Sequence, residues 1–320
     1  MYAYIYAIIS VICILLIVIL IRVFLKWTVT KFRSDISMKG KVVIVTGANT
    51  GIGYYTAKDL AARGARVILG CRNEEKGILA QNNIIKETGN SDILYKKLNL
   101  SDLNTVRKFA NEILESEERL DVLINNAGIF GLGNHVTVDG IVEGMQVNHF
   151  APFLLTLLLL PLLIKSQPSR IVNVNSTIHY LGFFKLNKLN KKGYYGKIRT
   201  YANSKLCHLI FTMDLAKRLQ DTGVVVNALH PGIIETGLLG KTNFLSRFGF
   251  KIWCWICCRS AEDGAQTSLY LAVAEENATV TGKYFVDCKP RFTLWTVRNQ
   301  TIARKLWELS ETLVGFKSDI

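Results

Sequence analysis

The sequence is poor in proline, in charged residues and in pairable cysteines, and each shortage excludes a class of protein. Five prolines in 320 residues exclude a collagen-like or proline-rich chain. Only 20% of the residues are charged and 49% are hydrophobic, so the chain can build a folded core and is not intrinsically disordered. The length allows one or two domains.

The seven cysteines are an odd number scattered along the chain, which argues against a secreted disulfide framework and favours reduced thiols in a cytosol-facing protein. Cys254, Cys257 and Cys258 form a C-x-x-C-C cluster. A structural zinc site needs four ligands, and no second Cys or His pair with metal spacing follows the cluster. We therefore expect no metal.

Acidic residues are scarce: 25 Asp and Glu stand against 39 Lys and Arg, a net charge of +14. Such a balance suits nucleic acid, an anionic membrane surface or a phosphorylated ligand. No acid occurs between Gly144 and Met213, or over residues 236–261, where basic residues alternate with Phe and Trp. Because no nucleic-acid-binding module is present, we expect no nucleic acid and favour the lipid–water interface. A solvated loop with a few buried aromatic residues remains the alternative for 236–261.

What the chain does have is a long apolar run at its N-terminus. Residues 1–21 carry no charged side chain, and Arg22, Lys26, Lys31 and Arg33 follow at once. About twenty apolar residues in a helix span a hydrocarbon core of about 30 Å. The run predicts a single-pass membrane anchor over 1–25 and a basic juxtamembrane linker over 26–39, and the positive flank places the rest in the cytosol. A buried core helix is the alternative.

From residue 40 onward, short apolar strands alternate with helical segments. Expected strands are 41–47, 66–70, 93–100, 121–128, 170–176, 224–232 and 283–287, and helices lie near 52–63, 73–87, 102–117, 201–220 and 261–274. Alternation of this kind predicts a doubly wound parallel sheet with helices on both faces. The short connections predict one domain over 40–320, ending in a helical tail. A second apolar run, 153–164, is too short to span a bilayer and is expected to be a buried helix.

The turn after the first strand favours phosphate binding. It reads Thr46-Gly47-Ala48-Asn49-Thr50-Gly51-Ile52-Gly53 and leads into a helix. Glycines allow a tight turn and close approach of the backbone to a pyrophosphate, and the helix N-terminus offers free N–H groups. At the first strand–helix junction of an alternating pattern, this turn predicts a Rossmann-type dinucleotide site.

The end of the second strand indicates which dinucleotide binds. It reads Leu69-Gly70-Cys71-Arg72, with no carboxylate to accept the ribose 2′-hydroxyl of NAD. A guanidinium can instead pair with a 2′-phosphate, so Arg72 favours NADP(H). A solvated surface arginine is the alternative.

Tyr201 and Lys205 are four residues apart on an expected helix and so share one face. A phenol with an unperturbed pKa of about 10 is a poor acid–base at neutral pH. We expect the neighbouring ammonium, together with a positively charged nicotinamide ring, to lower the pKa of Tyr201 toward the working range.

With these motifs, residues 40 to about 290 resemble the short-chain dehydrogenase/reductase family. The shared motifs are the glycine turn, Asn125-Asn126-Ala127-Gly128, Asn148, Ser176, Tyr201 with Lys205, and His230-Pro231-Gly232 with Thr236. The resemblance implies Tyr201 as acid–base, Lys205 as its pKa depressor and ribose anchor, Ser176 as the hydroxyl that orients the substrate, and Asn148 as part of a proton relay. It further implies a cofactor site made of Gly47, Asn49, Thr50, Gly51, Ile52, Gly53, Arg72, Asn99, Asn126, Gly128, Tyr201, Lys205, Pro231, Gly232 and Thr236.

Further cues are similar to the membrane-anchored retinol dehydrogenases, among them Cys71-Arg72-Asn73, Val147-Asn148-His149 and the tail that begins at Asn299. The chain departs from the family pattern in having Asn175 before Ser176 where a second serine is usual, and Asn99 where Asp is usual. The 25-position spacing from Ser176 to Tyr201 is also longer than usual.

The resemblance implies an endoplasmic-reticulum enzyme that uses NADP(H) and interconverts retinol and retinal, and it is compatible with a homodimer. Because cytosolic NADPH is mostly reduced, we expect carbonyl reduction to be the main direction. In this fold, residues 236–261 usually cover the substrate, and we expect them to act as a lid that dips into the bilayer. A steroid or lipid-aldehyde reductase, and a non-catalytic membrane-anchored binding protein, remain open.

Overall fold

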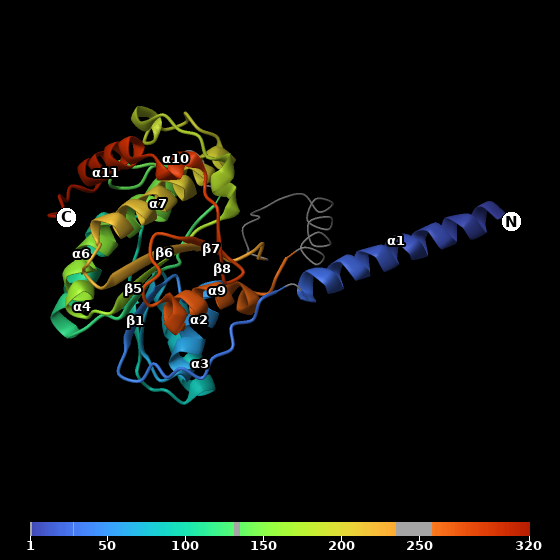
Figure 1. The fold of residues 1–320 in the computed structure, drawn as a ribbon, viewed down its shortest axis with the longest axis horizontal. Helices are drawn as coiled ribbons and strands as arrows, with labels where there is room; N and C mark the ends of the chain where they lie inside the picture. The colour runs from blue at the N-terminus through green and yellow to red at the C-terminus, as the bar shows by residue number, and fades with distance from the viewer. Residues whose placement is uncertain (1, 28, 131–134, 235–257) are drawn as a thin grey trace.

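The computed structural model describes residues 2–27, 29–130, 135–234 and 258–320, and its centre is one twisted sheet (Figure 1). The eight strands lie in the order β3-β2-β1-β4-β5-β6-β7-β8. All neighbours are parallel except the antiparallel pair β7–β8. The strands are β1 (Val42–Thr46), β2 (Arg66–Cys71), β3 (Ile93–Lys97), β4 (Val122–Asn125), β5 (Ser169–Val174), β6 (Val224–His230), β7 (Tyr284–Val286) and β8 (Lys289–Arg291).

Helices cover both faces of the sheet because its central strands are mostly apolar and almost entirely buried. Every residue of β1 and of β6 is buried. One core cluster joins a sheet face to α4, α6, α7 and α11, and the other joins the opposite face to α2, α3 and α9. These helices are α2 (Gly51–Ala62), α3 (Glu74–Thr88), α4 (Leu103–Ser116), α6 (Ala151–Lys165), α7 (Lys197–Arg218), α9 (Ala261–Val273) and α11 (Gln300–Val314). The predicted doubly wound Rossmann-type sheet is confirmed.

The second apolar run is a core helix, as predicted. Among the described residues, the helical stretch Glu143–Lys165 is long and apolar enough to cross a membrane, but 83% of its most apolar window is buried inside the domain. It consists of α5 (Glu143–Met145), the π-helix η1 (Gln146–Phe150) and α6. Packing of α6 against α4 and α11 accounts for its apolar sequence.

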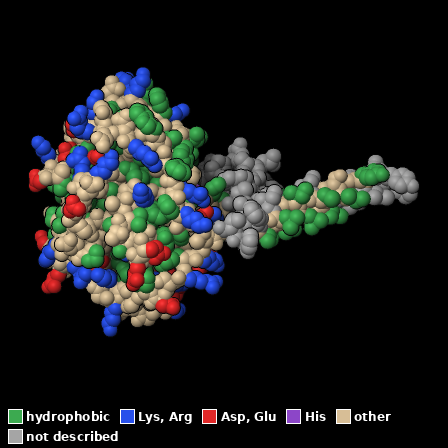
Figure 2. All heavy atoms as spheres, in the orientation of Figure 1, with side chains coloured by type: hydrophobic (Ala, Val, Ile, Leu, Met, Phe, Trp, Pro, Cys, Tyr) green, Lys and Arg blue, Asp and Glu red, His purple; other side chains and the backbone are tan. Residues whose placement is uncertain are grey.

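The N-terminal run forms one helix, α1 (Tyr2–Trp27), which projects away from the domain (Figure 1). Those of its side chains that the structure describes are mostly exposed and apolar, Ile9, Leu16 and Leu20 among them (Figure 2). A helix of this length, with exposed apolar side chains, is long enough to span a hydrocarbon core of about 30 Å.

The segment after α1 lies against the domain. The Phe32 ring contacts Tyr270 of α9 edge-on at 5.5 Å, and the Phe32 N–H donates to Gln266 Oε1 at 2.9 Å. Met38 is buried in the core on the same side. Residues 29–39, predicted as a linker, are thus held on α9 and the adjoining core.

Strand β8 is missing from the sequence-based prediction, which ends the sheet at 283–287. Its residues are Lys289, Pro290 and Arg291, and all three are exposed. A polar edge strand with a proline has none of the apolar character that identified the others. The chain then enters α10 (Trp295–Arg298) and the predicted helical tail, α11.

Candidate active site

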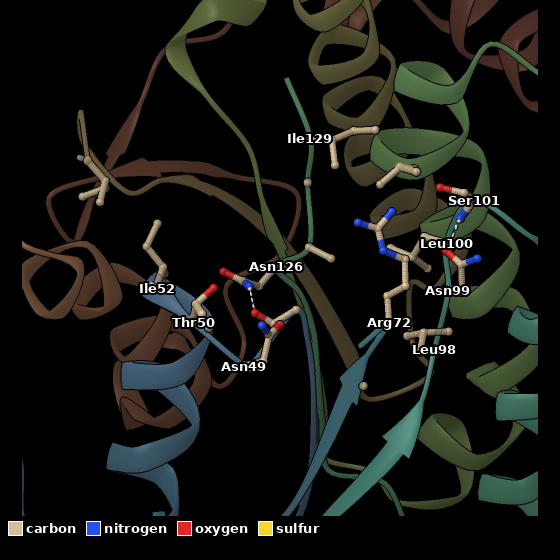
Figure 3. Close-up of a pocket in the computed structure, with 18 residues that line it drawn as sticks. Asn49, Thr50, Ile52, Arg72, Leu98, Asn99, Leu100, Ser101, Asn126 and Ile129 are labelled. Carbon is tan, nitrogen blue, oxygen red and sulfur yellow. Dashed lines mark hydrogen bonds between the residues drawn. The ribbon is translucent and has the colours of Figure 1, made fainter. Parts of the chain in front are cut away.

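The carboxyl ends of β1, β2, β3 and β4 border a cavity of about 490 Å³. Its wall contains ten residues that the sequence assigns to cofactor binding: Gly47, Asn49, Thr50, Gly51, Ile52, Gly53, Arg72, Asn99, Asn126 and Gly128. Figure 3 shows Asn49, Thr50 and Ile52 on one side and Arg72 and Asn99 on the other. Sequence reasoning left out further wall residues, which lie beside predicted ones at strand ends or on η1 and the segment after β6: Gly70, Leu98, Leu100, Ser101, Ala127, Ile129, Val147 and Ile234.

The glycine turn has the geometry that a dinucleotide phosphate requires. Gly47 and Gly51 have positive φ angles of 67° and 61°, which favour glycine. A Cβ at Gly53 would lie 2.5 Å from both Asn126 Nδ2 and the Gly47 oxygen, so a side chain there would collide with the turn. Thr50, the N-cap of α2, makes no side-chain capping bond, which leaves the first N–H groups of the helix for an anion. The residues present fit a nicotinamide dinucleotide.

Asn126 locks the end of β4 to the end of β1. Its Nδ2 donates to the Thr46 oxygen at 2.8 Å, and its N–H donates to Thr46 Oγ1 at 3.0 Å. The Ala127 N–H shares that hydroxyl at 3.0 Å. These bonds fix the Asn125–Gly128 motif against the glycine turn, so this motif shapes the floor of the cavity.

The far side of the cavity is polar and positively charged. Arg72 is the only charged side chain among the wall residues that the structure describes, and it is exposed. Asn99, another wall residue, accepts the Ser101 N–H at its Oδ1 at 3.2 Å (Figure 3). A carboxylate that would repel a 2′-phosphate is absent from this described wall.

Ser176, Tyr201 and Lys205 meet beyond the carboxyl end of β5. Ser176 caps the short 3₁₀-helix η2 (Thr177–Leu181), and Tyr201 and Lys205 lie on one face of α7. The Ser176 hydroxyl lies near enough to the Tyr201 phenol to lower the pKa of that phenol by hydrogen bonding. Lys205 Nζ lies 5.9 Å from the centre of the Tyr201 ring and donates to the Val174 oxygen at 3.0 Å.

Asn148 approaches the same group from η1. Its Oδ1 accepts the Ile129 N–H at 2.8 Å, while its Nδ2 donates to the Ile129 oxygen at 2.9 Å and to Ser204 Oγ at 3.0 Å. A Cβ at Gly128 would lie 3.4 Å from both Asn148 Oδ1 and Lys205 Nζ. Gly128 therefore lies where the cofactor cavity meets the Tyr201–Lys205 group.

Burial dominates the protonation of the pair. It raises the pKa of Tyr201, an effect that the hydrogen bond from Ser176 partly opposes. It also lowers the pKa of the buried Lys205 ammonium to about 8. In the protein alone, the lowered tyrosine pKa expected from the spacing is therefore not found, because removal from water disfavours both charged forms.

Pro231 and Gly232 follow β6 and lead to Ile234 on the cavity wall. Gly232 has a φ of 90°, and a Cβ on it would lie 2.7 Å from Arg259 Cδ. The Arg259 guanidinium makes a two-pronged ion pair with Asp287. The backbone N–H of Arg259 donates to the Ile233 oxygen at 2.7 Å. Thr236, the last predicted cofactor residue, lies outside the described residues, as do Cys254 and Cys257 and most of the expected lid.

The acid-free stretch 144–213 does not place all its cations at the surface. Lys205 is 4% exposed, and Arg170 is largely inside, where it donates to the Leu271 and Ala274 oxygens. The segment 185–199 carries most of the remaining cations, and all of them are exposed except Lys188.

Comparison with known proteins agrees with this geometry. The family model for short chain dehydrogenases matches residues 41–244. The chain is 43% identical over 290 residues to human retinol dehydrogenase 11, covering 89% of each chain. An uncharacterised protein of Mycobacterium paratuberculosis has a similar structure, with a TM-score of 0.73, 31% identity and 91% and 100% coverage of the two chains. A Shigella flexneri short chain dehydrogenase complexed with NADP has a TM-score of 0.63 and 26% sequence identity, and the match covers 80% of this chain and 100% of that one.

The match covers more than half of the chain, and it includes the glycine turn, the Asn125–Gly128 motif and the Ser176–Tyr201–Lys205 group. The chain therefore belongs to the short-chain dehydrogenase family of oxidoreductases, which use a nicotinamide cofactor.

Proposed function

We propose that this protein is an NADP(H)-dependent oxidoreductase that interconverts a lipophilic alcohol and its aldehyde or ketone, with retinol and retinal as the leading pair. The observation that carries the proposal is the meeting of Ser176, Tyr201 and Lys205 beside the cofactor cavity. When bound, the nicotinamide cofactor supplies the hydride for the carbonyl carbon, or accepts it in the reverse direction.

The chain's own residues handle the proton and the substrate oxygen. The Ser176 hydroxyl lies near the Tyr201 phenol, so a carbonyl oxygen placed between them would receive two O–H donors. Tyr201 then gives its proton to the developing alkoxide. Lys205, whose ammonium has a pKa of about 8, lies near enough to Tyr201 to restore that proton by way of water, and it would also hold the cofactor's ribose when the cofactor is bound.

Asn148 acts as a positioning residue in this scheme. Its amide oxygen and nitrogen are both used by Ile129 and Ser204, so the side chain is committed to holding η1 against the β4 loop. A relay at this position would use the backbone carbonyl of residue 148, which lies in the π-helical turn.

Arg72 supports NADP(H) over NAD(H). A guanidinium forms two-pronged, charge-assisted hydrogen bonds with phosphate, and the described wall offers no acid for a free ribose hydroxyl. We expect Arg72→Gln to weaken NADPH binding by about tenfold to a hundredfold and to leave NADH binding within about twofold.

A lipophilic substrate and a bilayer location are supported by the surface near the active site. Leu181 and Phe183, which follow Ser176 in the chain, are 60% and 68% exposed. Phe292, whose carbonyl accepts a hydrogen bond from the Tyr180 hydroxyl, is 87% exposed. With the apolar helix α1, these side chains suit a domain held at a membrane surface. We place the protein in the endoplasmic reticulum as a single-pass protein with its catalytic domain in the cytosol, and the retinol dehydrogenase relatives point to the substrate.

The raised pKa of Tyr201 favours reduction. A phenol that is protonated at neutral pH can donate at once to a carbonyl, whereas oxidation needs the phenolate. We therefore expect retinal reduction to be nearly independent of pH between 6 and 8, and retinol oxidation to increase with pH over that range.

The test is NADPH oxidation by the full chain in detergent with all-trans-retinal, compared with steroids and medium-chain aldehydes. Tyr201→Phe should lower kcat by about two orders of magnitude or more. Tyr95→Phe is the matched control, because that hydroxyl is buried with no hydrogen-bond partner among the described residues and Tyr95 does not line the cavity. NADPH binding without turnover of any carbonyl would instead identify a non-catalytic binding protein.

A further inference from the structure

A second cavity, of about 360 Å³, lies between the C-terminal half of α7, the turn before β7, and the β8–α10 connection. It shares no residue with the cofactor cavity. Four of its lining side chains are cationic and come from four different segments: Lys217, Lys283, Arg291 and Arg298. The lining contains no Asp or Glu.

These cations lack anionic partners within the part of the chain that the structure describes. The ion pairs found there use other basic residues, such as Arg218 with Asp214. Like charges gathered around a hollow repel one another, and a bound anion would remove that repulsion. Arginine is suited to a planar or tetrahedral oxyanion because it offers two parallel N–H donors.

The lining of this cavity also includes a buried tyrosine. Tyr284 of β7 lines it and is only 1% exposed, yet its hydroxyl has no hydrogen-bond partner among the residues that the structure describes. Burial raises the pKa of this phenol, so it is a neutral donor at any physiological pH. A buried hydroxyl without a partner is costly, and an oxyanion in the cavity would accept its hydrogen bond.

We propose that this cavity is a binding site for a phosphate-type anion, held by Lys217, Lys283, Arg291 and Arg298 with Tyr284 as a neutral donor. The ligand is a phosphoryl group, carried by a small soluble phosphate or by the headgroup of an anionic phospholipid. The site is independent of the catalytic assignment, because it shares no residue with the Ser176–Tyr201–Lys205 group.

Amine footprinting of the full chain in nonionic detergent tests the site, with saturating NADP⁺ present so that the cofactor cavity is filled. Inorganic pyrophosphate is the soluble probe, and sodium chloride of equal ionic strength controls for screening. We expect several-fold slower acylation of Lys217 and Lys283. Lys108, which lies on α4 and is exposed, should be unchanged and serves as the reference lysine.

Two variants assign the protection to the cavity. Arg291→Gln with Arg298→Gln should raise the pyrophosphate Kd by about tenfold or more. Tyr284→Phe, which removes one oxygen and leaves the ring, should raise it about fivefold. Equal protection of Lys108, or protection that survives both variants, would overturn the proposal.

Proteoliposomes separate the two sources of phosphate. The full chain is reconstituted in phosphatidylcholine with or without phosphatidic acid, and the same two lysines are followed. Protection by phosphatidic acid and not by pyrophosphate assigns a lipid headgroup, and protection by pyrophosphate in pure phosphatidylcholine assigns a soluble phosphate. Absence of protection in both arms refutes the site.

Discussion

Replacing Lys205 with Met should stabilise the fold while it abolishes turnover. The lysine is 4% exposed, and its only polar contact given by the described residues is the 3.0 Å bond to the Val174 oxygen. Burial lowers its pKa from 10.5 to about 8. A methionine has a similar length and volume and carries no charge, so it fills the same space without the desolvation cost.

The magnitude and the pH range follow from the pKa. A shift of about 2.5 pH units corresponds to roughly 3 kcal/mol of folding free energy at neutral pH. Below pH 8 the lysine is protonated in both the folded and the unfolded chain, so the whole free-energy cost of burying the ammonium is present. Between pH 8 and 10.5 the unfolded chain binds the extra proton, so stability increases with pH, and above 10.5 the cost has gone. Loss of the bond to Val174 removes about 1 kcal/mol, which leaves a net gain of roughly 2 kcal/mol.

Thermal unfolding of the detergent-solubilised protein without cofactor measures this gain. We expect Lys205→Met to raise Tm by about 5 °C at pH 7, and the difference from wild type to shrink as the pH increases toward 10. Lys108→Met, at an exposed position, provides the matched control. A lower Tm for Lys205→Met, or a difference independent of pH, would refute the assignment of a costly buried ammonium.

Three further outcomes test the cavity, the core and the segment after β6. Gly53→Ala should cost about 1–3 kcal/mol and reduce cofactor affinity, as measured by unfolding and fluorescence titration, because its Cβ collides with Asn126; an unchanged cofactor Kd would contradict this. Burial lowers the pKa of His149 to about 3, so stability should decrease as pH falls from 6.5 toward 3, and His149→Gln should show a smaller decrease in acid-unfolding scans. Asp287→Asn should raise the NADPH KM by roughly fivefold with little change in kcat, because Arg259 loses its ion pair; steady-state kinetics that show only a loss of kcat would argue against this role.

The sheet was predictable because its central strands are buried on both faces and consist mainly of apolar residues. Strand β1 and the glycine turn after it lie where the sequence placed them, and so do α6 and α7. Strand β8 was not predictable, because it is short, polar and at the edge. Its position depends on the β7–β8 turn, where Asp287 and Cys288 both take positive φ angles.

The residue types of the site were predictable from the sequence, but the burial of these residues and their pKa shifts were not. Motifs identified Ser176, Tyr201 and Lys205, but spacing along a helix says nothing about how much water reaches them. The π-helical turn at Asn148 was also hidden, because a change of backbone bonding register leaves no hydrophobic pattern. The wall residue Leu98 is adjacent to a predicted one and could have been found from the rule that cavities lie at the carboxyl ends of parallel strands.

Burial at the end of β5 sets the protonation of Tyr201 and Lys205, and the same burial makes the Lys205 ammonium costly in folding free energy. Removal from water raises the pKa of Tyr201 and lowers that of Lys205, so each group is driven toward its neutral form. A neutral phenol is the species that donates a proton to a carbonyl, and a lysine with a pKa of about 8 exchanges protons readily near neutral pH. If Lys205 were better solvated, its ammonium would cost less folding free energy, but its pKa would return toward 10.5 and it would be a poorer proton source for Tyr201. The instability predicted for Lys205 and the reductive direction proposed for the enzyme are therefore two consequences of the same desolvation.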